Sequence, residues 1–313
     1  MPEYLNKSDF QEIRSWVFRN ARPLELALWQ YHFENGSKEN VLSALAMYQN
    51  DDGGFGKTIE PDNWNPESTP YAADFAINIL RQIDFTDMDH PLYQGVLRYL
   101  ESTPYRGENG WFFSVPANDR FPHAVWWQYN EEGNNKDQNI GITAGLSGFI
   151  LRYVKADTEL YGIAQRYAEM LLDRLQSDTH YGDMGVLGFC ALYQDLDAAR
   201  LHNRFDLGFL ENKTRALIQD HFHEYVWSNH QDMAVVLPAP SVYYYKGNER
   251  SVSDSLDELI KIRPQNGVWG IPWEWYDGGK YTKEFAISEN WWRSYKAIEK
   301  LLFLRNYDRL CGK

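Results

Sequence analysis

The sequence predicts an all-α protein, an α/α toroid of about six helical hairpins whose inner helices form a central barrel. A Gly-aromatic turn recurs along the chain, and the helices before and after it differ in character. The turn aromatics lie about 53 residues apart, a period typical of stacked supersecondary units. They are Phe55, Trp111, Tyr181, Trp227 and Trp269. We therefore expect a single toroid domain that spans residues 1–313.

The two helix types differ in which faces are apolar. Residues 164–175 place apolar side chains on one stripe and charged side chains opposite, as an outer helix does. Other segments are apolar or small on every face, so we expect buried inner helices whose small residues let neighbouring backbones approach closely. These segments are 71–80, 140–151 and 185–192.

Prolines mark where two of these helices begin or break. Thr69, or the serine before it, is a suitable N-cap, and Pro70 then occupies the first helical position. Pro238 and Pro240 interrupt another inner segment, where we expect a short or broken helix because proline cannot donate the backbone hydrogen bond.

Composition excludes several classes of function. The chain carries a net charge of −13, which disfavours nucleic acid and anionic membranes as partners. No apolar run is long enough to cross a membrane, and no basic start precedes an apolar leader. The 2 cysteines form neither a disulfide framework nor a metal clip. We expect a cytoplasmic protein without metal or cofactor, and nothing indicates its oligomeric state.

Three connections between helices are long, at residues 50–68, 104–138 and 266–287. Each leads from an outer to an inner helix, so in a toroid all three emerge at one mouth of the barrel. They are rich in acidic residues and hold most of the tryptophans. We therefore expect an aromatic, acidic ligand site there, which binds neutral or cationic small molecules better than phosphorylated ones.

The first long loop contains Glu60, Asp62 and Trp64 in the string EPDNWN. Pro61 stiffens this segment, and two carboxylates beside a tryptophan suit general acid/base work or ligand hydrogen bonding. The alternative is a surface loop whose carboxylates favour a helix N-terminus.

The second long loop contains Asp119, His123, Trp126 and Trp127. The histidine could move protons near neutral pH, and the tryptophans could form a stacking or cation–π wall. If Trp127 lines the mouth, its replacement by alanine costs little stability. The alternative is a loop with a small hydrophobic core of its own.

The third long loop alternates aromatic and polar residues as Trp273, Glu274 and Trp275. If Glu274 were buried between the two indoles, its pKa would be raised, as a general acid requires. The alternative is an exposed glutamate. Trp291 and Trp292 lie at the start of the last inner helix, and we expect this pair to contribute both to the core and to the pocket.

The remaining turn residues are expected to be scaffold. Phe55, Trp111 and Trp269 would pack between adjacent hairpins, and Gln49 and Gln265 would cap neighbouring helix ends. The pair His221 and His223 resembles a metal pair, but positions two apart on a helix face different ways. Neither a zinc-protease string nor a phosphate-binding glycine loop occurs.

The turns QNDDGGFG at 49–56 and QNGVWG at 265–270 resemble the QW motif of the terpenoid cyclases and protein prenyltransferases. This resemblance implies an α/α toroid and an isoprenoid ligand. The acidic motifs and the zinc ligands of those families are missing: the nearest string to Asp-x-Asp-Asp is DMDH at 87–90, which is expected to be a solvated helix cap.

Three functions stay open from the sequence. The first is a protein that binds an apolar, isoprenoid-type molecule in an aromatic cavity, with a carboxylic acid that delivers a proton. The second is a carbohydrate-active enzyme, a glycoside hydrolase or lyase with paired carboxylates. The third is a binding module without chemistry.

Overall fold

The structure, a computed structural model, describes residues 2–130, 134–224 and 229–311. The prediction of an all-α protein is confirmed, because 61% of the chain is helical. Within the described ranges the only strands are β1 (Arg106–Gly107) and β2 (Gly110–Trp111), which pair antiparallel. The helices are α1 (Lys7–Asn20), α2 (Pro23–Phe33), α3 (Lys38–Ala46), α4 (Pro70–Gln82), α5 (Pro91–Ser102), α6 (Asn139–Tyr153), α7 (Glu159–Ser177), α8 (Gly185–Ala198), α9 (Leu207–Glu224), α10 (Asn229–Val236), α11 (Glu249–Lys261) and α12 (Thr282–Asn306).

The chain forms two compact units. Unit 1 contains Met1–Ala44, Phe222–Glu274 and Lys280–Lys313. Unit 2 contains Leu45–His221 and the short segment Trp275–Gly279. The closure of the hairpins into one ring stays a prediction, and each unit is described by itself.

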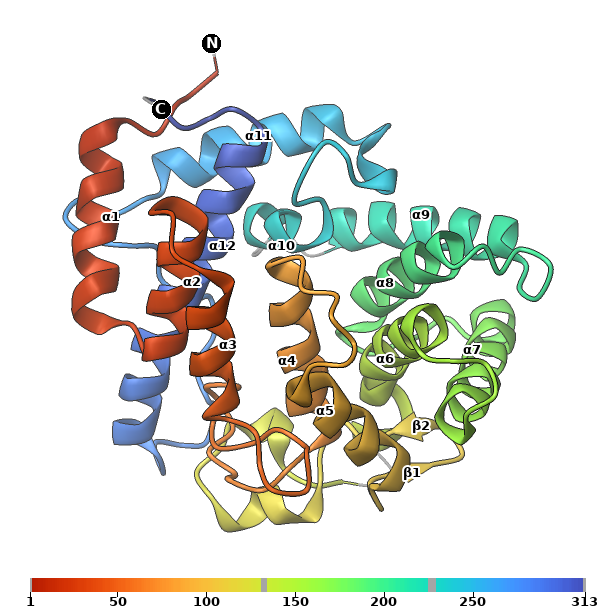
Figure 1. The fold of residues 1–313 in the computed structure, drawn as a ribbon. Helices are drawn as coiled ribbons and strands as arrows, with labels where there is room; N and C mark the ends of the chain where they lie inside the picture. The colour runs from red at the N-terminus through yellow and green to blue at the C-terminus, as the bar shows by residue number, and fades with distance from the viewer. Residues whose placement is uncertain (1, 131–133, 225–228, 312–313) are drawn as a thin grey trace. The chain divides into compact units, whose positions relative to one another are not determined.

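Unit 2 is built from two kinds of helix, as the sequence predicts. Its inner helices α4, α6 and α8 are neighbours in the order α4–α6–α8, and the outer helices α5 and α7 also contact each other (Figure 1). Nearly every residue of α6 is buried, whereas α7 buries only one face. The helix α4 begins at the N-cap Thr69, whose side chain accepts the backbone N–H of Ala72.

Glycines allow α6 and α8 to approach until their backbones touch. A Cβ atom added to Gly188 would lie 2.4 Å from the Gly141 carbonyl oxygen, so no larger residue fits there without a shift. Farther along both helices, a Cβ atom on Gly148 of α6 would lie 3.1 Å from the Cα atom of Leu192 of α8. Because the contacts advance in the same direction along both helices, α6 and α8 are parallel and their N-terminal ends lie at the same end of unit 2.

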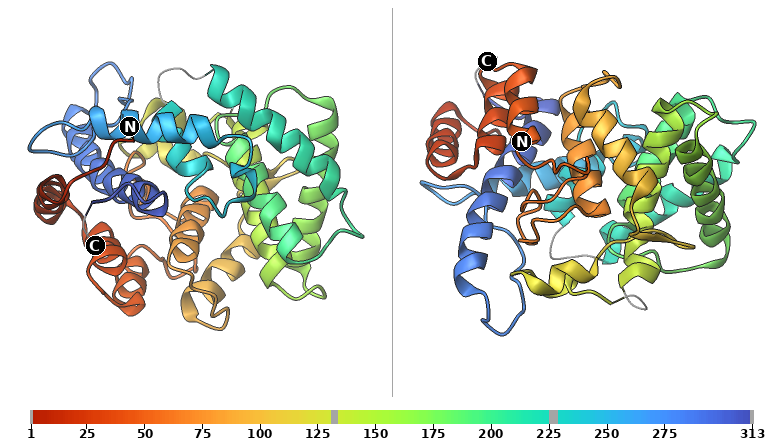
Figure 2. Two further views of the ribbon diagram at one scale, coloured as in Figure 1. Left: turned by 90° about the horizontal axis from the view of Figure 1, so that it is seen from above. Right: turned by 60° about the horizontal axis from the view of Figure 1, so that its bottom comes forward.

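In unit 1, the long helix α12 packs against α1, α2 and α10, and α10 also contacts α11. Figure 2 shows α1 and α2 in red beside α12 in dark blue. The helix α10 ends at Val236, directly before Pro238 and Pro240, so the expected short helix is confirmed. An ion pair between Arg22 and Glu25 is buried inside this unit.

The turn aromatics are buried scaffold residues, as predicted. The Trp111 indole N–H donates to the Leu100 carbonyl oxygen at 3.1 Å, and the Trp269 indole N–H donates to the Leu259 carbonyl oxygen at 2.7 Å. Both acceptors lie in the last turns of the preceding outer helices, where backbone carbonyls lack helical partners. Phe55 is also fully buried, whereas Trp227 lies outside the described residues.

Gln49 links its turn to the next outer helix. Its amide nitrogen donates to the carbonyl oxygens of Gly53 and Leu92, at 2.8 and 3.0 Å. Gln265 is exposed. The string at 87–90 is exposed in part and His90 caps α5, as expected for a solvated helix cap.

Candidate functional site

Segments of all three long loops meet in unit 2. The Trp64 N–H donates to the Pro122 carbonyl oxygen at 3.0 Å, and the Ala124 N–H donates to the Asp62 carbonyl oxygen at 3.0 Å. The Val125 N–H donates to the Trp275 carbonyl oxygen at 3.2 Å. We call residues 57–65, 118–127 and 275–276 the loop cluster. The third connection is shorter than predicted, because α12 already begins at Thr282.

Asparagines that the sequence analysis did not single out hold the loop cluster together. The Asn118 side-chain oxygen accepts the amide groups of Asn63 at 3.1 Å and Asn65 at 2.9 Å. Its own amide nitrogen donates to the Trp127 carbonyl oxygen at 3.0 Å. All three asparagines are buried, and an amide suits this place because it both donates and accepts. The clustering of asparagines in the string DNWN was the available signal.

The predicted carboxylates of the first loop are buried. Asp62 is 1% exposed, and its Oδ1 atom accepts the indole N–H of Trp275 at 2.6 Å. Glu60 is 5% exposed and lies on the same segment. The structure thus brings together Asp62 and Trp275, which are distant in the sequence. Their hydrogen bond ties the first loop to the third.

His123 lies opposite Asn63 in an antiparallel bridge. Its Nδ1 atom is 2.6 Å from the Phe121 carbonyl oxygen. Because a carbonyl can only accept, this contact assigns the proton of a neutral ring to Nδ1 and leaves Nε2 as the acceptor nitrogen. The Nε2 atom is 4.0 Å from Asp119 Oδ1, and the histidine side chain is mostly buried.

The two neighbouring tryptophans of the second loop differ in burial. Trp127 is 2% exposed, stacks on Phe113 at 4.6 Å and meets the edge of Tyr71 at 4.4 Å. The expectation that its replacement by alanine costs little stability is therefore wrong, because the loop has a hydrophobic core of its own. Trp126 is only partly buried, as is Trp64.

Backbone strain concentrates in the loop cluster. Most of the non-glycine residues with positive φ lie in turns or just after helices, where this conformation is common. Lys57 and Thr58, in a turn of the first loop, and Tyr276, outside any turn, have φ values of 53°, 62° and 53° inside the cluster. A β-branched residue rarely adopts this conformation, and such strain is enriched at functional sites. The exposed aromatic ring of Tyr276 lies next to the buried Trp275.

One buried acid of the inner helices was missed by the sequence analysis. Asp74 lies in α4 and is 9% exposed. Burial raises its pKa to about 7, although Arg81 and a hydrogen bond from Asn78 at 3.0 Å act in the opposite direction. The signal was present in the sequence, because Asp74 is a lone acid inside the otherwise apolar segment 71–80.

Asp74 borders a face of α4 that solvent reaches. Tyr71, Phe75 and Asn78 follow one another at helical spacing and are exposed in part or in full. A Cβ atom on Gly145 of α6 would lie 3.1 Å from the Asp74 Oδ1 atom, so the carboxyl group leans against the neighbouring helix where it has no side chain. An inner helix predicted to be apolar on every face thus has one accessible, partly polar face.

A second buried acid joins the C-terminal ends of the same helices. Asp195 of α8 is 1% exposed and accepts from Arg81 of α4 at 2.6 Å and from Arg152 of α6 at 3.2 Å. The guanidinium groups thereby compensate the buried carboxylate. None of these three residues was singled out from the sequence.

The other predicted site residues belong to unit 1. Trp273 meets Trp292 edge to face at 5.5 Å, and the Arg22 guanidinium lies 5.1 Å from the Trp291 ring. Trp292 is buried and therefore belongs to the core. Glu274 is exposed, so the burial required of a general acid is not found there.

Unit 1 also contains a buried cation that the sequence analysis did not use. Lys300 of α12 is 0% exposed, and its Nζ atom is 5.6 Å from the centre of the Trp269 ring. Burial and the nearby Lys296 lower its pKa to about 7, while Glu299 acts in the opposite direction.

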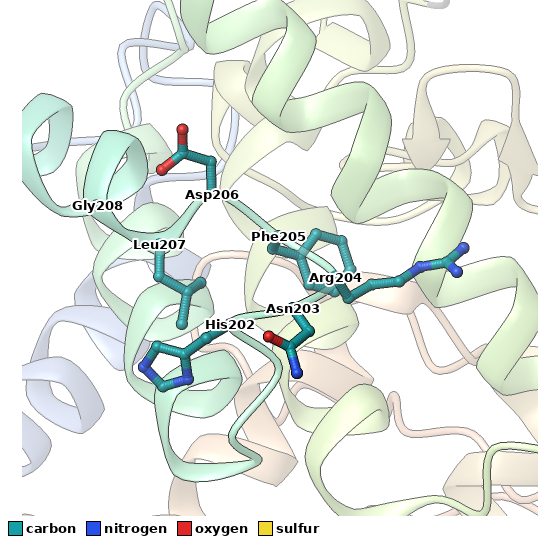
Figure 3. A pocket seen from close by; sticks show the side chains of 7 residues that line it. All are labelled: His202, Asn203, Arg204, Phe205, Asp206, Leu207 and Gly208. Atoms are coloured by element: carbon teal, nitrogen blue, oxygen red, sulfur yellow. The ribbon is translucent and has the colours of Figure 1, made fainter.

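One surface hollow of the described residues lies apart from the predicted site. A shallow hollow of about 430 Å³ is lined by residues of the connection between α8 and α9, from His202 to Gly208 (Figure 3). It contains none of the predicted site residues. No group of three metal-binding side chains occurs among the described residues, and the side chains of His221 and His223 lie outside them. No helix in the described ranges is long and apolar enough to span a membrane.

The described residues define an all-α protein in which two helices of unit 2, α4 and α8, carry buried acids. It matches no family model, no curated protein and no solved structure.

Proposed function

We propose that this chain is a terpenoid-cyclase-like protein that binds an apolar, isoprenoid-type small molecule on the accessible face of α4 beneath the loop cluster. In this proposal the six hairpins close into a toroid, and Asp74 exchanges a proton with the bound molecule. Glu60, Asp62 and His123 position the loops around it. The single observation that carries the proposal is the buried carboxyl group of Asp74 beside accessible aromatic side chains.

The chemistry of Asp74 supports acid/base work. A carboxyl group whose pKa is raised to about 7 is protonated about half the time at neutral pH, so it can both donate and accept a proton. Proteins rarely bury an acid with so little compensation, because desolvation of the charged form is costly. Such perturbed groups cluster at functional sites.

The surroundings of Asp74 support an apolar ligand. Tyr71 lies one turn away on α4, and its ring contacts Phe113 and Trp127 of the second loop. Aromatic faces of this kind provide apolar contact area and can stabilise positive charge that develops in a ligand. A neutral carboxylic acid in such a wall favours an uncharged reacting group over an anionic one.

The test is proton exchange with a neutral isoprenoid. The full chain would be incubated with geraniol or farnesol in deuterium oxide, and binding would be followed by tryptophan fluorescence. In the exchange step the deuterated carboxyl group of Asp74 adds a deuteron to an alkene carbon, and its carboxylate then takes a proton from that carbon, which restores the alkene. Mass spectrometry measures the deuterium bound to carbon after the hydroxyl deuteron has been exchanged back in water. We expect binding and slow incorporation by the native chain. The Asp74→Asn variant is expected to bind but not to exchange, whereas Asp89→Asn, in an exposed loop, is expected to behave like the native chain.

Binding without incorporation would overturn the acid/base role and leave the third function, a binding module without chemistry. Absence of binding by both alcohols would overturn the isoprenoid assignment. The readouts are independent, because fluorescence reports occupancy and mass spectrometry reports chemistry.

A carbohydrate-active enzyme is the second candidate, and one observation favours it. The accessible rings of Trp64, Trp126 and Tyr276 share the loop cluster with the buried carboxylates Glu60 and Asp62. Glycoside hydrolysis needs two such carboxyl groups beside a sugar. Release of reducing ends from a panel of neutral oligosaccharides, lost in Asp62→Asn, would favour this function over the isoprenoid one.

A further inference from the structure

Two arginines converge on one acid at the C-terminal ends of the inner helices of unit 2. Arg81 and Arg152 each occupy the last but one position of their helices, α4 and α6. Both donate to Asp195 of α8, whose side chain is 2% exposed. The two guanidinium groups thus bring two positive charges to one buried negative charge.

Aromatic rings hold both guanidinium groups in place. The Arg81 guanidinium lies 5.4 Å from the Phe149 ring, and the Arg152 guanidinium lies 4.8 Å from the Tyr153 ring. Phe149 itself stacks on Tyr93. Arginines that are fixed against rings keep their planar donor groups oriented, so an incoming anion need not order them.

Asp195 does not use all the donors that the arginines offer. A guanidinium has five N–H groups, yet Arg152 donates to Asp195 through Nη1 alone, and Arg81 donates through Nη2 to Asp195 and, at 3.4 Å, to the Gly145 carbonyl oxygen. The Arg81 Nε atom is buried and has no hydrogen-bond partner in the described part of the chain. Buried donors are normally satisfied, so an unpaired one here points to a further acceptor.

We propose that Arg81 and Arg152 bind an anionic group, a carboxylate or a phosphate monoester, carried by the apolar ligand of α4. The inference rests on the proposed function and specifies its substrate class as an amphipathic acid. Arg81 lies seven residues beyond Asp74 on the same face of α4, about 10 Å along the helix.

The two ends of the inner helices in unit 2 favour ligand groups of different charge. The two long loops that precede α4 and α6, at residues 50–68 and 104–138, are rich in acidic residues, so this end favours a neutral group. The arginines lie at the opposite ends, where a planar guanidinium can bind carboxylate or phosphate through two parallel hydrogen bonds. An amphipathic acid would therefore bind in one orientation, with its apolar end toward the loops and its anionic group at the arginines.

The competing role for the arginines is purely structural, as counter-ions of Asp195. The two roles predict different results for the native chain. If the arginines only compensate the acid, anionic ligands bind no more tightly than a neutral ligand of the same length. If they form an anion site, anions bind more tightly, and loss of either guanidinium group removes this preference.

The experiment compares three ligands of one chain length, farnesol, farnesoic acid and farnesyl monophosphate, by calorimetry on the full chain. We expect the native chain to bind both anions more tightly than the alcohol, with the tighter anion identifying the group. Arg81→Gln is expected to weaken the anions by about 10- to 100-fold and to change farnesol by less than about twofold. The matched control Arg98→Gln, on the exposed side of α5, is expected to change nothing.

Arg152→Gln keeps the test decisive if Arg81→Gln fails to fold, because the Arg152 side chain is 39% exposed. It is expected to weaken the binding of both anions by about 10-fold and to leave farnesol binding unchanged. Equal affinity of the three ligands for the native chain, or unchanged anion affinity in Arg152→Gln, would overturn the anion site while farnesol binding leaves the proposed function standing. If no ligand binds, both proposals fall.

Discussion

The loop cluster and the inner-helix face of unit 2 both bury carboxyl groups, but they compensate them differently. In the loops, Asp62 accepts an indole hydrogen bond at 2.6 Å from Trp275 and helps to tie two loops together. In the helices, the hydrogen bond from Asn78 does not offset the burial of Asp74, and its pKa is raised to about 7. The difference teaches that burial alone does not identify a reactive acid. An acid whose burial is poorly compensated is the better candidate.

The largest expected effect is loss of the core of the loops. We expect Trp127→Ala to lower the free energy of unfolding by about 3–5 kcal/mol. Trp127 is buried against Phe113 and Tyr71, so its removal leaves a large cavity. The matched control Trp126→Ala removes a partly exposed ring and is expected to cost about 1 kcal/mol. Urea denaturation measures both, and equal losses would contradict the distinction between the neighbours.

Disruption of the hydrogen bonds of Asn118 is expected to have the next effect on stability. Asn118→Ala leaves the amides of Asn63 and Asn65 and the carbonyl of Trp127 without their acceptor or donor, so we expect a loss of about 3 kcal/mol. The exposed Asn203 offers a control whose replacement by alanine is expected to be neutral within about 0.5 kcal/mol. A loss below about 1 kcal/mol for Asn118→Ala would show that water replaces the network.

Removal of the Asp74 charge is expected to stabilise the protein at alkaline pH. Its pKa is raised from 3.8 to about 7 on folding, so between these values the folded state retains a proton that the unfolded state has released. The stability contribution of Asp74 therefore falls as pH rises from 4 to 7 and stays low above that. We expect Asp74→Asn to gain about 4 kcal/mol at pH 8 relative to its effect at pH 4, measured by urea denaturation.

Asp89→Asn, which removes the same charge from an exposed loop, is the matched control. If the stability difference between Asp74→Asn and the native chain were the same at both pH values, Asp74 would be an ordinary compensated carboxylate, and the comparison would fail.

The smallest effect is expected in unit 1. The pKa of Lys300 is lowered from 10.5 to about 7, so between these values the unfolded state binds a proton that the folded state lacks, and stability rises with pH. Below pH 7 the cost of burying the charge is fully present, though partly offset by the Trp269 ring. The shift alone corresponds to about 4 kcal/mol, and the ring offsets about 2 kcal/mol of it, so we expect Lys300→Met to gain about 2 kcal/mol at pH 6 relative to pH 10. A gain at pH 10 instead would contradict the assignment.

Local patterns in the sequence predicted the scaffold, because each depends on residues close in the chain. The glycines of α6 and α8, the cap at Thr69 and the break before Pro238 lie where expected, and Trp111 and Trp269 are buried turn residues. The meeting of the three long loops also followed from their shared connection type. These are matters of periodicity and turn chemistry.

The site was harder to predict, because it depends on contacts between distant residues. Composition alone did not show that Trp127 would pack inward while Trp126 remained accessible. Asp74 and Asp195 were overlooked because the helices were classified by their average character, although a single acid in an apolar helix carries more information than that average. The Asn118 network needed the register of two loops, which no local pattern determines.

The protonation of Asp74 tests the account most directly. Carboxyl carbon-13 chemical shifts of the full chain, with the resonance assigned by comparison with Asp74→Asn, would follow this group between pH 4 and 9. We predict a transition near pH 7, well above the ordinary value of 3.8 for an aspartate. A transition near pH 4 would show that Asp74 is an ordinary compensated carboxylate, and the proposed acid/base role would have to be abandoned.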